Sequence, residues 1–299
     1  AISPWRYYIA SSEQEVLERI SLAEVIVSNK VFLNREAILA AQRLKLICVA
    51  ATGYNNIDLV AAAERNVPVC NVRNYATPSV VQHVFMLMLN LTRRFLEYQE
   101  LVKRGGWQAS TFFCPLDFGI QELSGKTLGI IGFGVLGQAV ADVAQAFGMQ
   151  LLIAEHKGRP ARAGRIAFDD VMQQADFISL HCPLTPETCD LISTREFELM
   201  KPSAVLINTA RGGLVNEADL LHSLATGRIA GAAIDVLLEE PPKQGNLILQ
   251  HQLTNLIVTP HIAWASRESR QRLLDQLANN IENFLQQRPF NQITDALHQ

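Results

Sequence analysis

The chain has 299 residues, which favours two domains, and hydrophobic residues make up 48% of it against 18% charged residues. A sizeable core can therefore form, and a disordered chain is excluded. The net charge of −3 and the lack of a basic run argue against nucleic acid and anionic membranes as partners. The longest apolar stretch, residues 80–91, is too short and too polar to span a bilayer.

The five cysteines form an odd set without a Cys-x-x-Cys pair, which is not the pattern of a disulfide framework or a zinc site. They are Cys48, Cys70, Cys114, Cys182 and Cys189. A signal-peptide pattern is not found either. We therefore expect no metal site and a protein of the reducing cytoplasm.

Short β-branched runs alternate with helical stretches along the chain, which is typical of parallel sheets with crossover helices. The first third contains three predicted buried strands with predicted helices between them. The strands are residues 25–28, 46–50 and 67–72, and the helices are residues 13–20, 35–41 and 59–65.

A second series of six predicted strands begins near residue 123 and is typical of a doubly wound dinucleotide fold. The strands are residues 127–132, 150–154, 177–181, 204–209, 229–235 and 256–259, with helices at residues 137–147, 168–174 and 217–226. Two longer predicted helices, residues 80–104 and 266–287, flank this series.

The sequence therefore predicts an α/β protein with two doubly wound parallel-sheet domains. The long flanking helices would be the hinges between them. The first domain would be discontinuous, made of residues 1–98 and 265–299, and the second would be residues 99–264.

A glycine-rich turn, Gly132-Phe-Gly134-Val-Leu-Gly137, joins the first strand and the first helix of the second series. Gly132 permits the sharp turn, Gly134 lets the backbone approach a pyrophosphate, and Gly137 allows the helix to pack closely on the strand. Val135 and Leu136 would present their amides to the phosphates at the helix N-terminus. A tight turn without a ligand is the alternative, but the flanking strand and helix favour a dinucleotide.

The acidic residue expected about 20 residues further on is Glu155, at the end of the second strand. Its carboxylate would accept both ribose hydroxyls of NAD, whereas a 2′-phosphate would meet like charge. The basic residues that follow are His156, Lys157, Arg159 and Arg162. They would pair with such a phosphate, so we favour NAD as the cofactor and leave NADP open.

Three residues beyond the carboxyl ends of neighbouring strands supply the parts of a hydride-transfer site. Arg211 can hold a substrate carboxylate through paired charge-assisted hydrogen bonds. His261, if protonated, can neutralise the charge that develops on an acceptor oxygen. Glu240 would favour the charged imidazole and orient its ring. A surface arginine and a structural histidine are the alternatives, but all three positions share one predicted sheet edge.

Two more residues at this edge are assigned to the cofactor. Asp235 ends the strand before Glu240, where it would accept a hydrogen bond from the nicotinamide carboxamide. Thr209 ends the strand before Arg211.

With these residues in place, the chain resembles the D-isomer-specific 2-hydroxyacid dehydrogenases. The resemblance lies in motifs that follow one another in the family's order. They are Glu122-Leu-Ser-Gly-Lys-Thr-Leu-Gly-Ile-Ile-Gly, Asn208-Thr-Ala-Arg211-Gly-Gly-Leu-Val, Asp235-Val with Glu240-Pro, and Thr259-Pro-His261. It implies a flavodoxin-like substrate domain and a Rossmann NAD-binding domain with the cleft between them. Arg211 would then bind the substrate, His261 would be the acid/base, and Glu240 would orient it.

The same resemblance implies a substrate and an assembly. Thr52 and Gly53 match the loop whose backbone amides hold the substrate carboxylate, although a plain glycine turn is the alternative. Gln82, and the segment that begins Ala263-Trp264, resemble the glycerate and hydroxypyruvate subgroup. We therefore favour reduction of hydroxypyruvate or glyoxylate to D-glycerate or glycolate, by a homodimer that associates through the Rossmann domain.

Two further expectations concern the limits of this resemblance. The strand with which the family usually begins is not found before Trp5, so we expect N-terminal sequence to be missing. A dinucleotide-sensing interaction protein, like the corepressors of the family, is the alternative to an enzyme. The intact trio of Arg211, Glu240 and His261 argues against pure sensing, because a sensor does not need a proton donor.

Overall fold

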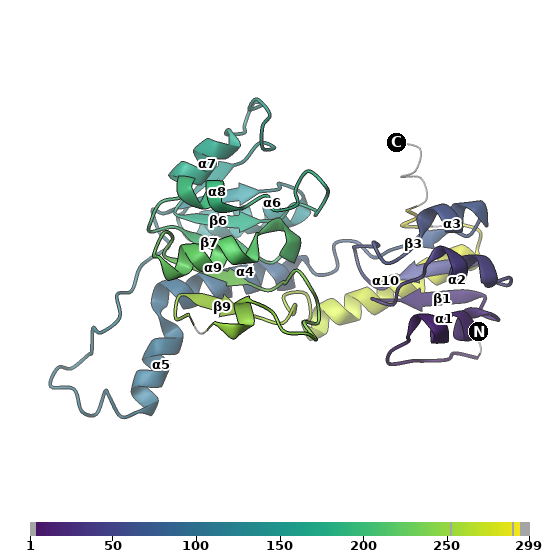
Figure 1. The fold of residues 1–299 in the computed structure, drawn as a ribbon, viewed down its shortest axis with the longest axis horizontal. Helices are drawn as coiled ribbons and strands as arrows, with labels where there is room; N and C mark the ends of the chain where they lie inside the picture. Colours follow the sequence, from purple (N-terminus) through teal and green to yellow (C-terminus); the bar gives the residue numbers. More distant parts are fainter. Residues whose placement is uncertain (1–3, 252, 289, 294–299) are drawn as a thin grey trace. The chain divides into compact units, whose positions relative to one another are not determined.

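The structure is a computed structural model that describes residues 4–251, 253–288 and 290–293. It divides into two compact units (Figure 1). The first unit runs to Ala76 and resumes at Arg267, and the second is Thr77–Ser266. The second unit thus begins before the predicted boundary at residues 98/99, because α4 (Thr77–Arg93) packs against α6 (Val135–Ala146), β7 (Val205–Asn208) and β8 (Gly231–Ile234) of that unit.

The first unit is built on a small parallel sheet whose strands follow in the order β1-β2-β3. Its elements are α1 (Glu13–Ile20), β1 (Val25–Ser28), α2 (Arg35–Ala40), β2 (Leu46–Val49), α3 (Leu59–Glu64), β3 (Val69–Cys70) and α10 (Arg267–Leu285). Each predicted strand and helix of the first third is therefore confirmed, with β3 shorter than expected. The helix α10 packs against β2, so the two sequence segments of this unit share one core.

Local signals explain where the short helices of this unit begin. The side chain of Asn34 accepts a hydrogen bond from the Ala37 amide at 2.9 Å, and that of Asp58 accepts one from the Ala61 amide at 2.8 Å. Such caps satisfy amides that have no partner inside the helix. The buried faces of the helices then close over strand residues that are fully buried, such as Ile47.

The second unit is built on six parallel strands in the order β5-β4-β6-β7-β8-β9. The strands are β4 (Thr127–Ile131), β5 (Gln150–Ile153), β6 (Phe177–Leu180), β7 (Val205–Asn208), β8 (Gly231–Ile234) and β9 (Leu256–Val258). The six predicted strands are therefore confirmed. An isolated parallel bridge between Ala154 and Ile166, which the sequence pattern did not predict, continues the sheet beyond β5.

Helices cover both faces of this sheet (Figure 1). They are α4, α6 (Val135–Ala146), α7 (Phe168–Gln174), α8 (Thr194–Leu199) and α9 (Glu217–Ala225). A further helix, α5 (Phe95–Lys103), packs against α4, and short 3-10 turns form η1 (Gly212–Leu214) and η2 (Ile248–Gln250). The strand order reverses between β4 and β6, and ligands of such sheets bind beyond the carboxyl ends at that point. The helix α8 was not predicted, although its capping box of Ser193 and Glu196 is readable in the sequence.

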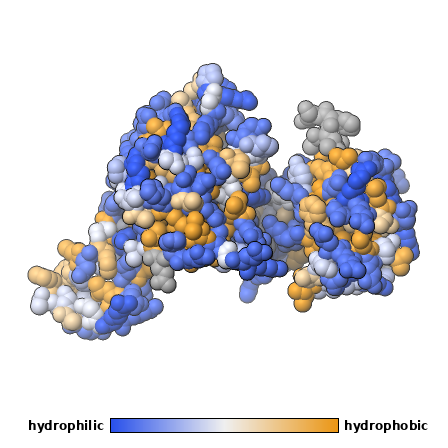
Figure 2. Space-filling model, viewed as in Figure 1, coloured by the Kyte–Doolittle hydropathy of each residue, from blue (hydrophilic) through white to orange (hydrophobic). Residues whose placement is uncertain are grey.

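The prediction of one helix over residues 80–104 is wrong. The chain forms α4 and α5, separated by Arg94 in the left-handed conformation at φ 52°. Eight side chains of α4 are buried, whereas none of α5 is, so the apolar periodicity that supports α4 against the sheet does not continue. In Figure 1, α5 and the segment after it project from the body of the second unit. Apolar side chains are exposed on this projection (Figure 2), among them Phe112 and Phe113.

Within the described residues, no helix is long and apolar enough to cross a membrane.

Candidate active site

The glycine turn between β4 and α6 has the geometry that each of its glycines predicts. Gly132 has φ 94°, and a Cβ there would lie 2.5 Å from the Cys182 nitrogen. A Cβ at Gly137 would lie 2.2 Å from the Gly132 oxygen. A Cβ at Gly134 would meet nothing within 4 Å. Gly132 and Gly137 are therefore required by packing, whereas Gly134 leaves open space where α6 begins.

The amides of Val135 and Leu136 belong to the first turn of α6, where N–H groups have no acceptor inside the helix. Open space beside such amides suits a pyrophosphate, because the helix dipole also favours negative charge there.

A buried hydroxyl gives a second, independent indication of a ligand. Thr209 follows β7, and within the described residues its Oγ1 is buried without a hydrogen-bond partner. A buried polar group without a partner costs about 1–3 kcal/mol, which a bound molecule can remove by supplying a partner. The residues at this edge of the sheet therefore fit a bound dinucleotide.

The carboxylate of Glu155, beyond the end of β5, is not free as the sequence suggested. Its oxygens accept hydrogen bonds from Arg162 at 2.6 and 2.8 Å, and from the backbone and ring of His156 at 2.9 and 2.8 Å. The Arg162 guanidinium is the main reason why the pKa of Glu155 is well below its ordinary value. The side chain is 1% exposed because these partners cover it at the surface.

The loops after β7 and β8 are in contact, which brings Arg211 towards Glu240. A Cβ on Gly212 would lie 2.0 Å from the carbonyl carbon of Leu237, so only glycine permits this approach. The Arg211 side chain is exposed, and its Nη1 donates to the Ala210 carbonyl at 2.7 Å. Arg211 therefore lies where an exposed guanidinium can meet an anionic ligand.

Glu240 and His261 form the pair that the sequence predicts. Glu240 Oε1 accepts a hydrogen bond from the Leu237 amide at 3.0 Å, and Oε2 lies 2.5 Å from His261 Nδ1. Both side chains are about one quarter to one third exposed, at 30% for Glu240 and 26% for His261. Because Nδ1 faces the carboxylate, Nε2 on the other side of the ring faces away from Glu240. This arrangement orients the ring and leaves Nε2 available for a hydrogen bond with a ligand.

Asp235 anchors the segment that carries His261. Its buried carboxylate accepts hydrogen bonds from Thr259 Oγ1 at 2.5 Å and from the amides of Ile262 and Ala263 at 2.9 Å each. Its backbone carbonyl accepts the His261 amide at 2.7 Å. The sequence assigned Asp235 to the nicotinamide, and this contact stays a prediction. The anchoring role was not foreseen.

His83, on α4, extends this network and was missed by sequence reasoning. Its Nε2 lies 3.0 Å from Thr259 Oγ1. Because the Thr259 hydroxyl donates its proton to Asp235, His83 Nε2 must donate to Thr259. Burial lowers the pKa of His83, and the Asp235 charge opposes this. The resemblance to the family singled out Gln82, the residue before His83. The sequence therefore pointed to this part of α4 but not to His83 itself.

Thr52 and Gly53 lie in the loop after β2 in the first unit, where Thr52 is exposed and its carbonyl accepts the Asn71 side-chain amide at 2.7 Å. Their contact with a substrate stays a prediction. The described residues include no group of three or more His, Cys, Asp or Glu side chains placed to hold a metal ion.

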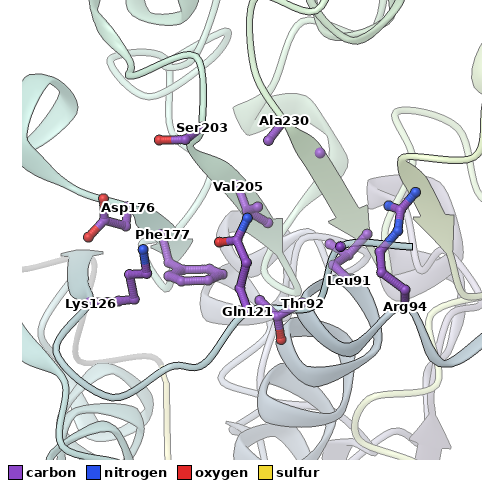
Figure 3. Close-up of a pocket in the computed structure, with 12 residues that line it drawn as sticks. Leu91, Thr92, Arg94, Gln121, Lys126, Asp176, Phe177, Ser203, Val205 and Ala230 are labelled. Atoms are coloured by element: carbon purple, nitrogen blue, oxygen red, sulfur yellow. The ribbon is translucent and has the colours of Figure 1, made fainter. Parts of the chain in front are cut away.

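A pocket of about 230 Å³ lies at the opposite, amino edge of the large sheet (Figure 3). It is lined by the first residues of β6, β7 and β8 and by charged side chains, two of which form ion pairs. Asp176 pairs with Lys201 at 2.9 Å, and Arg94 pairs with Glu97 at 3.0 Å. This pocket is separate from the site that contains His261, because that site lies at the carboxyl ends of the strands.

Comparison with known proteins agrees with this geometry. Residues 85–263 match the family described as D-isomer specific 2-hydroxyacid dehydrogenase, NAD binding domain. The chain is 45% identical over 278 residues to a glycerate dehydrogenase of Methylorubrum extorquens, which covers 93% of this chain and 88% of that one. It is 38% identical to a hydroxypyruvate reductase of Blautia hydrogenotrophica, covering 93% and 87%.

Among solved structures, an acyclic imino acid reductase in complex with NADPH and D-Arg is similar at a TM-score of 0.84 and 32% identity, covering 96% of this chain and 91% of that one. The chain belongs to the D-isomer specific 2-hydroxyacid dehydrogenase family. It is therefore an oxidoreductase that acts on CH–OH groups, with a nicotinamide adenine dinucleotide as its cofactor.

The two glycines give a matched pair of variants. Gly137→Ala should lower the free energy of unfolding by about 1–3 kcal/mol, because its methyl group overlaps the Gly132 carbonyl. Gly134→Ala should change stability by less than about 0.5 kcal/mol yet weaken NADH binding, because its methyl group enters the open space. Thermal unfolding and NADH titration measure both. Equal losses of stability would contradict this account of the turn.

Proposed function

We propose that this protein reduces hydroxypyruvate or glyoxylate to D-glycerate or glycolate, with His261 as the general acid. The observation that carries the proposal is the hydrogen bond between His261 Nδ1 and Glu240 Oε2 at the edge that also presents Arg211. The glycerate dehydrogenase and hydroxypyruvate reductase relatives support this substrate class. The choice among small 2-oxo acids rests on that likeness.

The chemistry follows from what each side chain can do. Arg211 holds the substrate carboxylate and its carbonyl, so that the carbonyl carbon is presented in one orientation. When bound, the reduced nicotinamide supplies a hydride. His261 Nε2 gives its proton to the carbonyl oxygen, which would otherwise become an alkoxide. Glu240 keeps the ring in place throughout.

The remaining residues have supporting roles in this proposal. Gly132, Gly134 and Gly137 shape the pyrophosphate site, and Thr209 and Asp235 contact the cofactor near its nicotinamide end. The backbone amides of Thr52 and Gly53 contribute to binding the substrate carboxylate, a role that the resemblance to the family supports.

The experiment that tests the function follows NADH absorbance with hydroxypyruvate, glyoxylate and pyruvate in parallel. We expect turnover of hydroxypyruvate or glyoxylate to exceed that of pyruvate in kcat/KM. Binding of NADH without turnover of any oxo acid would refute the proposal and favour a dinucleotide-sensing protein.

The acid role of His261 predicts a loss in the chemical step. His261→Gln should lower kcat by about 10²–10⁴-fold while the Kd for NADH stays nearly unchanged. His251→Gln is the matched control, because His251 is exposed and bonds only the Leu247 carbonyl in the described structure. Steady-state kinetics and NADH titration separate the two effects. A parallel loss of kcat and NADH affinity would contradict an acid role.

We also propose that the protein is a cytoplasmic homodimer that associates through its second unit. The five cysteines, all within the described residues, are free thiols, as expected in a reducing compartment. An apolar groove between α4 and α6 supports the dimer, with the rings of Phe85 and Phe147 stacked at 5.2 Å between centroids. Apolar residues around this groove are partly exposed, with Met86 and Phe147 at 39% each and Phe95 at 53%, and exposed apolar patches mark interaction sites.

A charge in this groove should therefore prevent association. Met86, which lines the groove, is 39% exposed. Met86→Asp should shift the mass in solution from dimer to monomer, because the aspartate would be buried without a partner. Leu22→Asp, at a position 69% exposed in the first unit, should leave the mass unchanged. Light scattering coupled to size exclusion measures both, and a monomeric unmodified protein would refute the dimer.

A further inference from the structure

The contacts of Glu155 bear on which dinucleotide the protein accepts. Its two oxygens receive Nε and Nη2 of Arg162 at 2.6 and 2.8 Å, so that the guanidinium forms a fork on the carboxylate. Oε1 also accepts the backbone and ring N–H groups of His156, and the Arg162 amide lies 3.4 Å from Oε2. A carboxylate offers about four acceptor positions, so these donors satisfy Glu155. No acceptor is left for two ribose hydroxyls.

The exposed fractions of these side chains show which groups a ligand can reach. The Glu155 side chain is 1% exposed, whereas that of Arg162 is 66% exposed and that of His156 is 69% exposed. A guanidinium has five N–H donors. Glu155 uses two of those on Arg162, at Nε and Nη2, which leaves three. The accessible face of this pair is therefore cationic.

The other basic residues of the loop differ in what their side chains contact. Lys157 forms an ion pair with the buried Glu196 at 2.8 Å. Arg165 lies with its guanidinium 5.0 Å from the centre of the Phe133 ring, and Phe133 belongs to the glycine turn. Arg165 thus joins the loop to the place where the pyrophosphate is expected.

Charge counting supports a phosphate at this surface. Lys157 and Arg195 are balanced by Glu196 and Asp169. Glu155 cancels one of the three arginines at positions 159, 162 and 165, and Glu187, which interacts with Arg159, cancels a second. One net positive charge is left, which suits the 2′-phosphate of NADP. Arginine binds phosphate through paired, charge-assisted hydrogen bonds, which a ribose hydroxyl cannot match.

We propose that Arg162 is the residue that determines cofactor selectivity: held by Glu155, it keeps that carboxylate from the ribose of NADH and presents its remaining N–H groups to a 2′-phosphate. The protein therefore binds NADPH at least as tightly as NADH. This inference rests on the proposed dehydrogenase function. It differs from the expectation from the sequence, which favoured NAD through Glu155 and left NADP open.

Dinucleotide binding tests this without any oxo acid present. In the unmodified protein, fluorescence titration should give a Kd for NADPH equal to or lower than that for NADH. The fragment 2′,5′-ADP should compete with NADPH better than 5′-ADP does. NADH binding more than about tenfold tighter than NADPH, a difference of about 1.4 kcal/mol, would overturn the proposal whether or not any variant folds.

The variant Arg162→Gln removes the guanidinium and releases Glu155. We expect the Kd for NADPH to rise by about tenfold or more, because charge-assisted hydrogen bonds are lost. The Kd for NADH should stay the same or fall, because Glu155 can then accept ribose hydroxyls. Equal weakening of both dinucleotides, or loss of NADH binding alone, would overturn the assignment.

Arg159→Gln is the matched control, because it makes the same change of charge on the same loop without a hydrogen bond to Glu155 in the described structure. It should change the ratio of the two Kd values much less than Arg162→Gln does. An equal change would mean that the general charge of the loop, rather than Arg162, sets selectivity.

Turnover of hydroxypyruvate is measured separately. A protein that binds both dinucleotides but reduces no oxo acid would refute the proposed function and leave the result for Arg162 standing.

Discussion

The structure of the proposed active site depends on the hydrogen bonds of Asp235. The carboxylate of this residue is buried at the end of β8, and it organises the segment that leaves β9 by accepting the Thr259 hydroxyl and two backbone amides. His261, inside that segment, has φ 53°, a conformation that costs a residue with a side chain about 1 kcal/mol or more. The bonds to Asp235 offset this cost. They hold the imidazole against Glu240.

Several carboxylates lie at this edge of the sheet, and each accepts hydrogen bonds from donors of its own. Glu240 has the Leu237 amide and His261, Asp235 has the loop after β9, and Glu155 has Arg162 and His156. Carboxylates satisfied in this way do not repel an anionic substrate as free ones would. Arg211 is exposed at this edge. In the proposed function it supplies positive charge for the oxo acid. The arrangement follows from strand order, because β7, β8 and β9 are neighbours and end on one side.

Much of this could be predicted from the sequence where the signal is local. The large-sheet strands are short apolar runs, and the glycine turn is specified by steric demands at Gly132 and Gly137. The break at Arg94 could not be predicted, because hydrophobic periodicity does not register one left-handed residue. The partners of Glu155 and Asp235 could not be predicted either. Motif spacing identifies a carboxylate at a sheet edge but does not say which side chain folds back onto it.

The central claim is that a hydride reaches the carbonyl carbon while His261 protonates the oxygen. The most direct measurement uses NADH or NADPH deuterated at the transferring position of the nicotinamide, with hydroxypyruvate as substrate. NMR and chiral separation of the glycerate then locate the label. The account predicts D-glycerate with deuterium at C2. Unlabelled C2, or the L isomer, would contradict it.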